Sequence, residues 1–153
     1  MDENNPTDYL AGHPIILYRK LDATWLLAEE LESQTNDVKT SFLIELTRLL
    51  GVFFAAGVVH MDIRLSNIFF KVQDCSTVSI VVIDWDDALM RDAIIPEYLH
   101  SSDRSIPIPR KYEDATAEVN EYFVEKLQEN IFSDDQHLKK KPRVEEHHSD
   151  VTG

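Results

Sequence analysis

Two strand-like runs that lie close together constrain the fold of this chain most. Residues 68–72 and 78–83 are rich in Ile, Val and Phe, and the mostly polar segment 73–77 separates them. Runs of this length and composition are typical of buried strands, and so short a connection favours an antiparallel hairpin. A hairpin brings the residues before its first strand beside those after its second. The segments 60–67 and 83–88 are therefore predicted to meet at one edge.

Amphipathic helices are predicted on both sides of this hairpin. Residues 38–56 carry apolar side chains at helical spacing, and Gly57 is a natural C-cap. One face holds Phe42, Leu46, Leu49, Leu50 and Phe53, and Leu43, Ile44, Val52 and Phe54 thicken the stripe. So wide a stripe predicts a central helix packed on several sides. A second helix is predicted over 115–132, and its apolar side holds Ala115, Val119, Tyr122, Phe123, Leu127 and Ile131.

Shorter signals predict the remaining elements. Asp22 looks like the N-cap of a helix over 23–33, and Pro14–Tyr18 is typical of a short buried strand. Three prolines within 89–113 predict mostly irregular structure there. The fold class predicted from these elements is α+β and mainly helical.

The composition fits one folded domain and excludes several classes of function. The chain has 153 residues and a net charge of −13, so it lacks the basic face that nucleic-acid binding needs. A single cysteine, Cys75, excludes an internal disulfide and a cysteine-rich zinc site. The longest apolar stretch, around residues 49–59, is too short for a membrane-spanning helix.

The ends of the chain differ in composition from its middle. Residues 1–8 are predicted to be a disordered N-terminus, 9–133 the folded unit, and 134–153 a disordered charged tail. The N-terminus lacks the features of a secretory signal, which predicts an intracellular protein. Lys139–Arg143 is a basic cluster of the kind that acts in nuclear import, so cytoplasmic and nuclear locations both stay open.

Polar residues gather at the predicted base of the hairpin. Asp62, Asn67 and Asp84 would place three oxygen-bearing side chains in one small volume. Such ligands suit Mg²⁺, which takes one or two carboxylates together with waters and substrate phosphates. A carboxylate close to the ion can accept the proton of an attacking hydroxyl, and Arg64 can offset the charge of a phosphate. This set of residues is typical of phosphoryl transfer.

The order of these residues also resembles a known family. His60-x-Asp62-x-Arg64-x-x-Asn67, followed by strand, turn, strand and Asp84, resembles the catalytic and metal-binding loops of the protein-kinase-like superfamily. The resemblance implies Mg²⁺ and ATP as cofactors. It also implies Asp62 as catalytic base, Asn67 and Asp84 as metal ligands, and His60 as a structural support.

The details of the motif point to particular branches of that superfamily. Ile83-Asp84-Trp85 is similar to the aminoglycoside and choline kinases, and to fungal-type and crinkler-type kinases. Met61 stands where protein kinases commonly have arginine. The acceptor of the phosphate therefore stays open between a protein Ser or Thr, which is preferred, and a small molecule.

Only 59 residues precede His60. The resemblance therefore covers a large catalytic lobe within 9–133, without a complete small lobe and without its glycine-rich loop. Lys20 can be cast as the small-lobe lysine, but this assignment leaves no sequence for the later strands of that lobe. The main alternative to an active kinase is a catalytically silent pseudokinase module that binds a protein partner; oligomeric state stays open.

Overall fold

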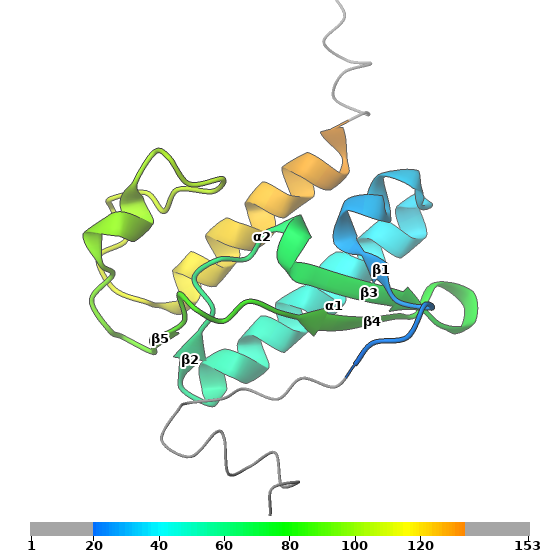
Figure 1. Ribbon diagram of the computed structural model, residues 1–153, viewed down its shortest axis with the longest axis horizontal. Coiled ribbons are helices and arrows are strands. Elements are labelled where there is room, and N and C mark those ends of the chain that lie inside the picture. The colour runs from blue at the N-terminus through cyan, green and yellow to red at the C-terminus, as the bar shows by residue number, and fades with distance from the viewer. Residues whose placement is uncertain (1–19, 134–153) are drawn as a thin grey trace, which may run out of the picture.

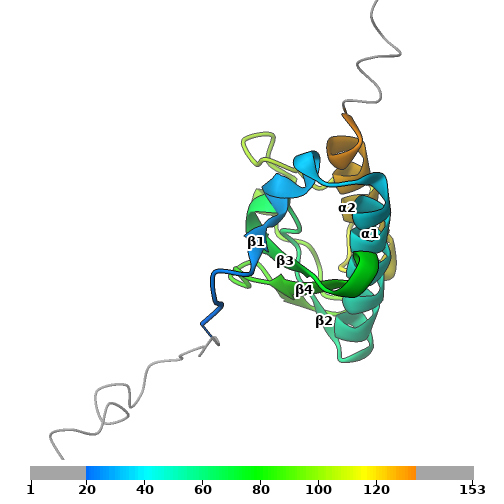
Figure 2. The same cartoon turned by 90° about the vertical axis from the view of Figure 1, so that its right-hand side faces the viewer.

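The computed structural model describes residues 20–133, which form an α+β fold. Helices α1 (Asn36–Ala55) and α2 (Ala117–Ile131) pack on each other and run in opposite directions (Figure 1). Figure 2 shows the sheet of three strands, in the order β1-β3-β4, beside this pair of helices. The predicted class is thus confirmed at the level of α+β.

The predicted hairpin is confirmed. Strands β3 (Ile68–Val72) and β4 (Val78–Val82) are antiparallel, with Ile68 opposite Val82 and Val72 opposite Val78. One short 3-10 turn, Asp74–Ser76, joins them. The residues that the hairpin buries are Ile68, Phe70, Val78 and Val82.

The helix predicted over 23–33 is wrong in its first half. Strand β1 (Leu26–Leu27) pairs with β3, and only Ala28–Ser33 is helical, as a 3-10 helix. Asp22 accepts a hydrogen bond from the Thr24 N–H, which makes a local turn rather than a helix cap. The free edge of β3 offers backbone hydrogen bonds to an apolar segment, and this tertiary pairing outweighs a weak local preference for helix.

Helix α1 begins two residues earlier than predicted and ends one residue earlier, at Ala55. The Thr35 side chain caps it by accepting a hydrogen bond from Val38 N–H. Gly57 follows its end at φ +92°, a left-handed conformation that glycine adopts without a steric penalty. The chain then enters β2 (Val58–Val59), which pairs with β5 (Leu89–Met90).

The prediction that α1 is packed on several sides holds only in part, because α1 packs on α2, β2 and β4 but keeps part of its apolar stripe exposed. Phe42, Leu46 and Leu50 are buried, but Ile44 is 66% exposed and Val52 50% exposed. Helix α2 and the sheet cover only part of its circumference, so apolar side chains remain on its surface. Helix α2 itself buries the predicted stripe of Val119, Phe123, Leu127 and Ile131.

The long connection between β5 and α2 is mostly irregular, as predicted, and is fastened at several points. A short 3-10 helix, Glu97–His100, interrupts it, and the ring of His100 donates from Nδ1 to the Ile108 carbonyl at 2.8 Å. The Ile108 N–H donates to the Leu99 carbonyl at 3.0 Å. These bonds close a loop over residues 101–106.

Three predictions fall outside the described residues: the strand Pro14–Tyr18, the N-terminus 1–8 and the tail 134–153. Within residues 20–133, no helix combines the length and apolar character needed to cross a bilayer.

The side chain of Phe42 anchors α1 to the sheet, which leads to a prediction about stability. It is fully buried and meets Phe70 edge to face, with 6.1 Å between ring centroids. Phe42→Ala should lower the free energy of unfolding by about 3–5 kcal/mol, because it leaves a cavity. The exposed Val52→Ala should change it by less than about 0.5 kcal/mol. Urea unfolding of both variants checks this, and equal effects would contradict the packing described.

Candidate functional site

The two loops predicted to meet do meet at the edge of the hairpin. Ile83 N–H donates to the Asn67 carbonyl at 2.8 Å, which extends the pairing of β3 and β4 by one residue. The His60 ring bonds to the Ile83 carbonyl at 2.9 Å. Both ends of the segment 60–67 are thereby held against the residue that precedes Asp84.

Both loops contain a residue in the left-handed region. Met61 has φ 70° and Asp84 has φ 59°. Aspartate tolerates this conformation, but a bulky side chain such as methionine adopts it only when the surroundings impose it. Met61 is fully buried in the core, which anchors the turn that follows His60. The buried Met61 side chain thus fixes the conformation of the segment 60–67.

Asp62 lies at the centre of a set of hydrogen-bond donors. Asn67 Nδ2 donates to its carboxylate at 3.0 Å and to its backbone carbonyl at 2.9 Å. Arg104 Nη2 lies 3.2 Å from Asp62 Oδ1, and Arg64 Nε lies 3.5 Å from Oδ2. The carboxylate is therefore held on both oxygens.

Arg104 belongs to this site but is not predicted from the sequence, and it joins Asp87 to the site. Arg104 Nη2 lies 3.0 Å from Asp87 Oδ2, so one guanidinium bridges Asp87 and Asp62. Arg64 also joins the segment 60–67 to the loop over 101–106, because its Nη1 donates to Ser105 Oγ at 3.1 Å. Arg104 stands in an irregular loop far along the chain, where no local pattern could have placed it.

His60 uses both ring nitrogens. Asp62 N–H donates to Nδ1 at 3.1 Å, so the ring proton resides on Nε2 and is donated to the Ile83 carbonyl. The ring also packs edge-on against Trp85, with centroids 4.6 Å apart. These contacts suit a supporting role, because they tie the start of one loop to the other.

Burial lowers the pKa of His60 below its ordinary value of 6.5. The opposing effects are the hydrogen bond to the Ile83 carbonyl and the negative charges of Asp62, Asp84 and Asp87. A protonated ring would also lose its ability to accept from the Asp62 N–H. Three carboxylates thus face a ring that the fold keeps neutral.

Trp85 packs rather than facing outward. Its ring meets Phe53 edge to face at 4.8 Å, and its Nε1–H donates to the Val82 carbonyl at 3.1 Å. The residue after Asp84 is thus fixed to α1.

Of the two predicted metal ligands, Asn67 lies against Asp62, and Asp84 lies on the surface in the neighbouring loop. Asn67 is buried, and its amide nitrogen donates hydrogen bonds to Asp62. The atom of Asn67 that can coordinate a cation is therefore its amide oxygen. Asp84 is exposed, and its charge acts on the nearby His60 ring. Waters and phosphate oxygens would complete such a site. Within residues 20–133, no group of three or more His, Cys, Asp or Glu side chains could hold a metal ion.

Lys20 lines a cavity of about 380 Å³ next to this site. The walls are Lys20, Leu21, Asp22, Trp25, Lys71, Val81 and Ile83. Apolar side chains with two lysines suit a flat apolar ring that carries anionic groups. The cavity reaches Ile83, so Lys20 shares a cavity with the residue that precedes Asp84, and its assignment as the small-lobe lysine stays a prediction.

Comparisons of the chain with protein-family models, with curated proteins and with solved structures find no match. The resemblance of residues 60–84 to the protein-kinase-like superfamily therefore stays a prediction.

The environment of His60 predicts how stability depends on pH. Since its pKa is lower in the folded chain than in the unfolded chain, the unfolded state binds more protons below about pH 6.5. The contribution of His60 to stability is therefore present above that pH and is lost as the pH falls. In a buffer with EDTA, an NMR titration should give a His60 midpoint below 6.5, and His60→Asn should flatten the pH dependence of unfolding. A midpoint above 6.5 would contradict this environment.

The bridge made by Arg104 yields a second prediction. Its side chain is 19% exposed and separates two carboxylates, so Arg104→Ala should cost roughly 1–3 kcal/mol of stability. Arg110 pairs with Glu97 in the same connection but is 69% exposed, so Arg110→Ala should lower the stability far less than Arg104→Ala. Thermal and urea unfolding measure both, and a neutral Arg104→Ala would show that the bridge does not hold the loop.

Proposed function

We propose that residues 20–133 are the large lobe of a kinase-like phosphotransferase, which binds Mg-ATP and transfers its γ-phosphate to a hydroxyl. The observation that supports this most is the fastening of Asp62, Asn67 and the loop of Asp84 at one edge of the hairpin. A protein Ser or Thr is the preferred acceptor, and a small alcohol is the alternative.

Asp62 would receive the proton of the attacking hydroxyl. The hydroxyl oxygen forms a bond to the γ-phosphorus, while the bond from that phosphorus to the ADP oxygen breaks. Asn67 and Arg64 orient the carboxylate through the Oδ2 side. Arg104 occupies the Oδ1 side, so an acceptor has to enter beside its guanidinium or displace it.

Two further features support binding of a nucleotide with its cation. The Asn67 oxygen and Asp84 would hold Mg²⁺, which when bound would neutralise phosphate charge. Lys20 and Lys71 line the adjacent cavity together with Trp25, and an apolar ring could lie there with its phosphates directed past Ile83 toward Asp84.

A silent pseudokinase-type module is the second candidate. The Asp62 carboxylate, which a base would need to offer freely, has ion pairs with both Arg64 and Arg104. The four glycines of the sequence, at positions 12, 51, 57 and 153, are also too far apart for a phosphate-covering loop. Both features favour binding over turnover.

Nucleotide binding can be tested by thermal shift. Millimolar Mg-ATP should raise the unfolding temperature by several degrees, since a ligand at about 100 times its Kd adds roughly 2.7 kcal/mol. Asp84→Asn should abolish the rise, whereas Asp86→Asn, a matched change at a neighbouring exposed carboxylate, should retain it. No rise in the unaltered chain, or an equal rise in Asp84→Asn, would refute the nucleotide site.

Transfer separates the two candidates. With radiolabelled ATP, the phosphotransferase should label Ser- and Thr-containing peptides or an aminoglycoside or choline acceptor. Asp62→Asn should reduce the rate by about 10²–10⁴-fold without abolishing the thermal shift. Nucleotide binding without any transfer would support the silent module.

A further inference from the structure

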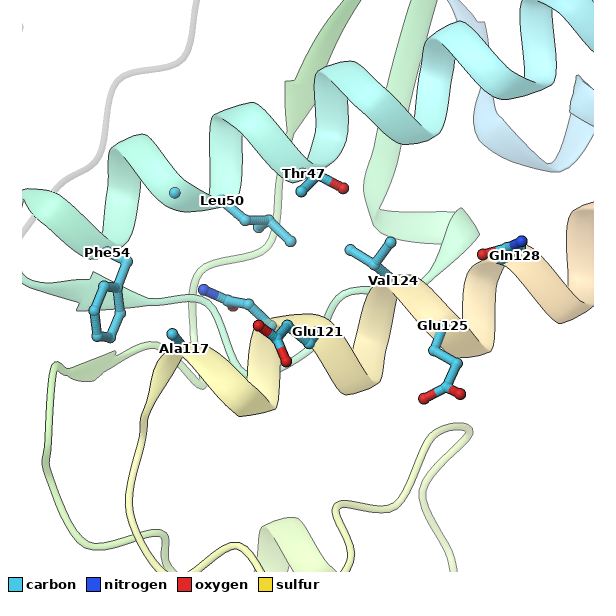
Figure 3. A pocket seen from close by; sticks show the side chains of 10 residues that line it. Thr47, Leu50, Phe54, Ala117, Glu121, Val124, Glu125 and Gln128 are labelled. Carbon is cyan, nitrogen blue, oxygen red and sulfur yellow. The ribbon is translucent and has the colours of Figure 1, made fainter.

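An apolar groove runs between the two helices and is not part of the site described above. The first part of the groove is a cavity of about 350 Å³, and Figure 3 shows Leu50 on α1 directed toward Val124 on α2 and Phe54 opposite Ala117. A second hollow of about 460 Å³ continues it toward Ile44 and Phe132. Thr47, Val124 and Gln128 line both parts, so the two form one feature, the α1–α2 groove.

Side chains that would normally be covered remain open in this groove. Ile44 is 66% exposed, although it belongs to the apolar stripe of α1. Gly51 lines the groove, is exposed, and an added Cβ there would meet nothing within 4 Å, so this position has room for a side chain. A contiguous apolar surface of this kind is typical of an interaction site.

One buried polar group in the wall also lacks a partner. Asn120 is 8% exposed, and its Oδ1 accepts no hydrogen bond within residues 20–133. An unsatisfied buried acceptor costs about 1–3 kcal/mol, and a donor that enters the groove and reorients the amide would remove this cost. The groove thus offers apolar contact along its length and a polar contact at one point.

The rim of the groove carries negative charge. Glu121 and Glu125 lie one turn apart on α2, and neither forms an ion pair within the described part of the chain. Figure 3 shows the Glu121 carboxylate beside the cavity and the Glu125 carboxylate on the side of α2 that points away from α1. The whole chain carries a net charge of −13. A basic occupant is therefore favoured, and a second copy of this chain is disfavoured because it would bring the same acidic rim against this one.

The length of the groove indicates the shape of its occupant. From Thr40 to Phe54, α1 advances by about 21 Å, at 1.5 Å per residue. A third helix commonly packs in the groove between two antiparallel helices and so completes a bundle. About four turns of helix would cover it.

We propose that the α1–α2 groove binds an amphipathic helix of another protein, about four turns long, apolar on one side and flanked by Lys or Arg. The apolar side packs on Ile44, Phe54 and Val124, and the basic residues pair with Glu121 and Glu125. This interaction does not depend on the phosphotransfer chemistry proposed above.

The probe is a fluorescein-labelled 16-residue peptide with leucines at positions 3, 7, 10 and 14 and lysines at its ends, a spacing that makes one apolar helix face (roughly every 3.6 residues). A scrambled peptide of the same composition is its control. Fluorescence anisotropy with the full chain should show binding of the patterned peptide that is at least about tenfold tighter than that of the scrambled one.

Variants of the groove make the test specific. Gly51→Leu puts a bulky side chain at a lining position where an added Cβ meets nothing within 4 Å, and it should weaken binding at least about tenfold, while its higher helix propensity favours the fold. Ile44→Glu should weaken binding similarly, and Val52→Glu should not, although both put the same charge on an exposed site of α1. Circular dichroism melts check that each variant folds; if Ile44→Glu does not, Gly51→Leu still decides.

Four outcomes would overturn the proposal. The first is equal binding of the two peptides, or no detectable binding of either peptide at about 100 μM. The second is unchanged binding by Gly51→Leu. The third is binding that appears only after residues 134–153 are removed, which would assign the groove to the chain's own tail. The fourth is a dimer in sedimentation that Gly51→Leu dissociates, which would assign it to a second copy.

Discussion

The pairing of Ile68 with Val82 is the interaction on which the candidate site depends. It places Asn67 opposite Ile83, whose N–H and C=O then bond to the Asn67 carbonyl and the His60 ring. A slip of one residue would move every side chain of a strand to the opposite face and would separate the two loops. The buried positions of β3 and β4 oppose such a slip, because it would expose apolar side chains to water. Burial of the hairpin therefore keeps the two polar loops next to each other at its edge.

The ion pairs around Asp62 hold the loop over 101–106 against the same edge of the hairpin. Arg64 and Arg104 bring two positive charges against Asp62 and Asp87, and Arg104 bridges the two carboxylates. Without the guanidinium, the carboxylates would repel each other in a half-buried place. The same contacts hold the loop over 101–106 against the segment 60–67. Arg104 thus has two opposing effects. It stabilises the loop over 101–106, and it occupies one side of the Asp62 carboxylate, which a substrate would have to reach.

Local patterns predicted the parts of this structure that local interactions decide. The hairpin, the stripe of α2 and the meeting of 60–67 with Ile83 follow from strand composition and chain connectivity. The helix over 23–33 is predicted from Asp22 as an N-cap, but the apolar run Trp25–Ala28 has no distinct period, and pairing with the edge of β3 decides the conformation of Leu26 and Leu27. The bridge by Arg104 joins residues far apart in an irregular connection, so no spacing in the sequence could reveal it.

Helix α1 separates the two proposed sites. Phe53 faces the sheet side, where it packs on Trp85 and so steadies the loop of Asp84, while Phe54 lines the groove. Neighbouring residues on a helix point about 100° apart, so a partner helix on Phe54 leaves Asp62 and Asp84 uncovered. Occupancy of the groove would alter the loops if the partner favoured a different packing of Phe53 against Trp85, or a different position of Tyr122, whose hydroxyl donates to the Pro107 carbonyl. A rigid helix with well-packed aromatic rings favours independent binding at the two sites, which suits a module that holds one protein while its loops meet another molecule.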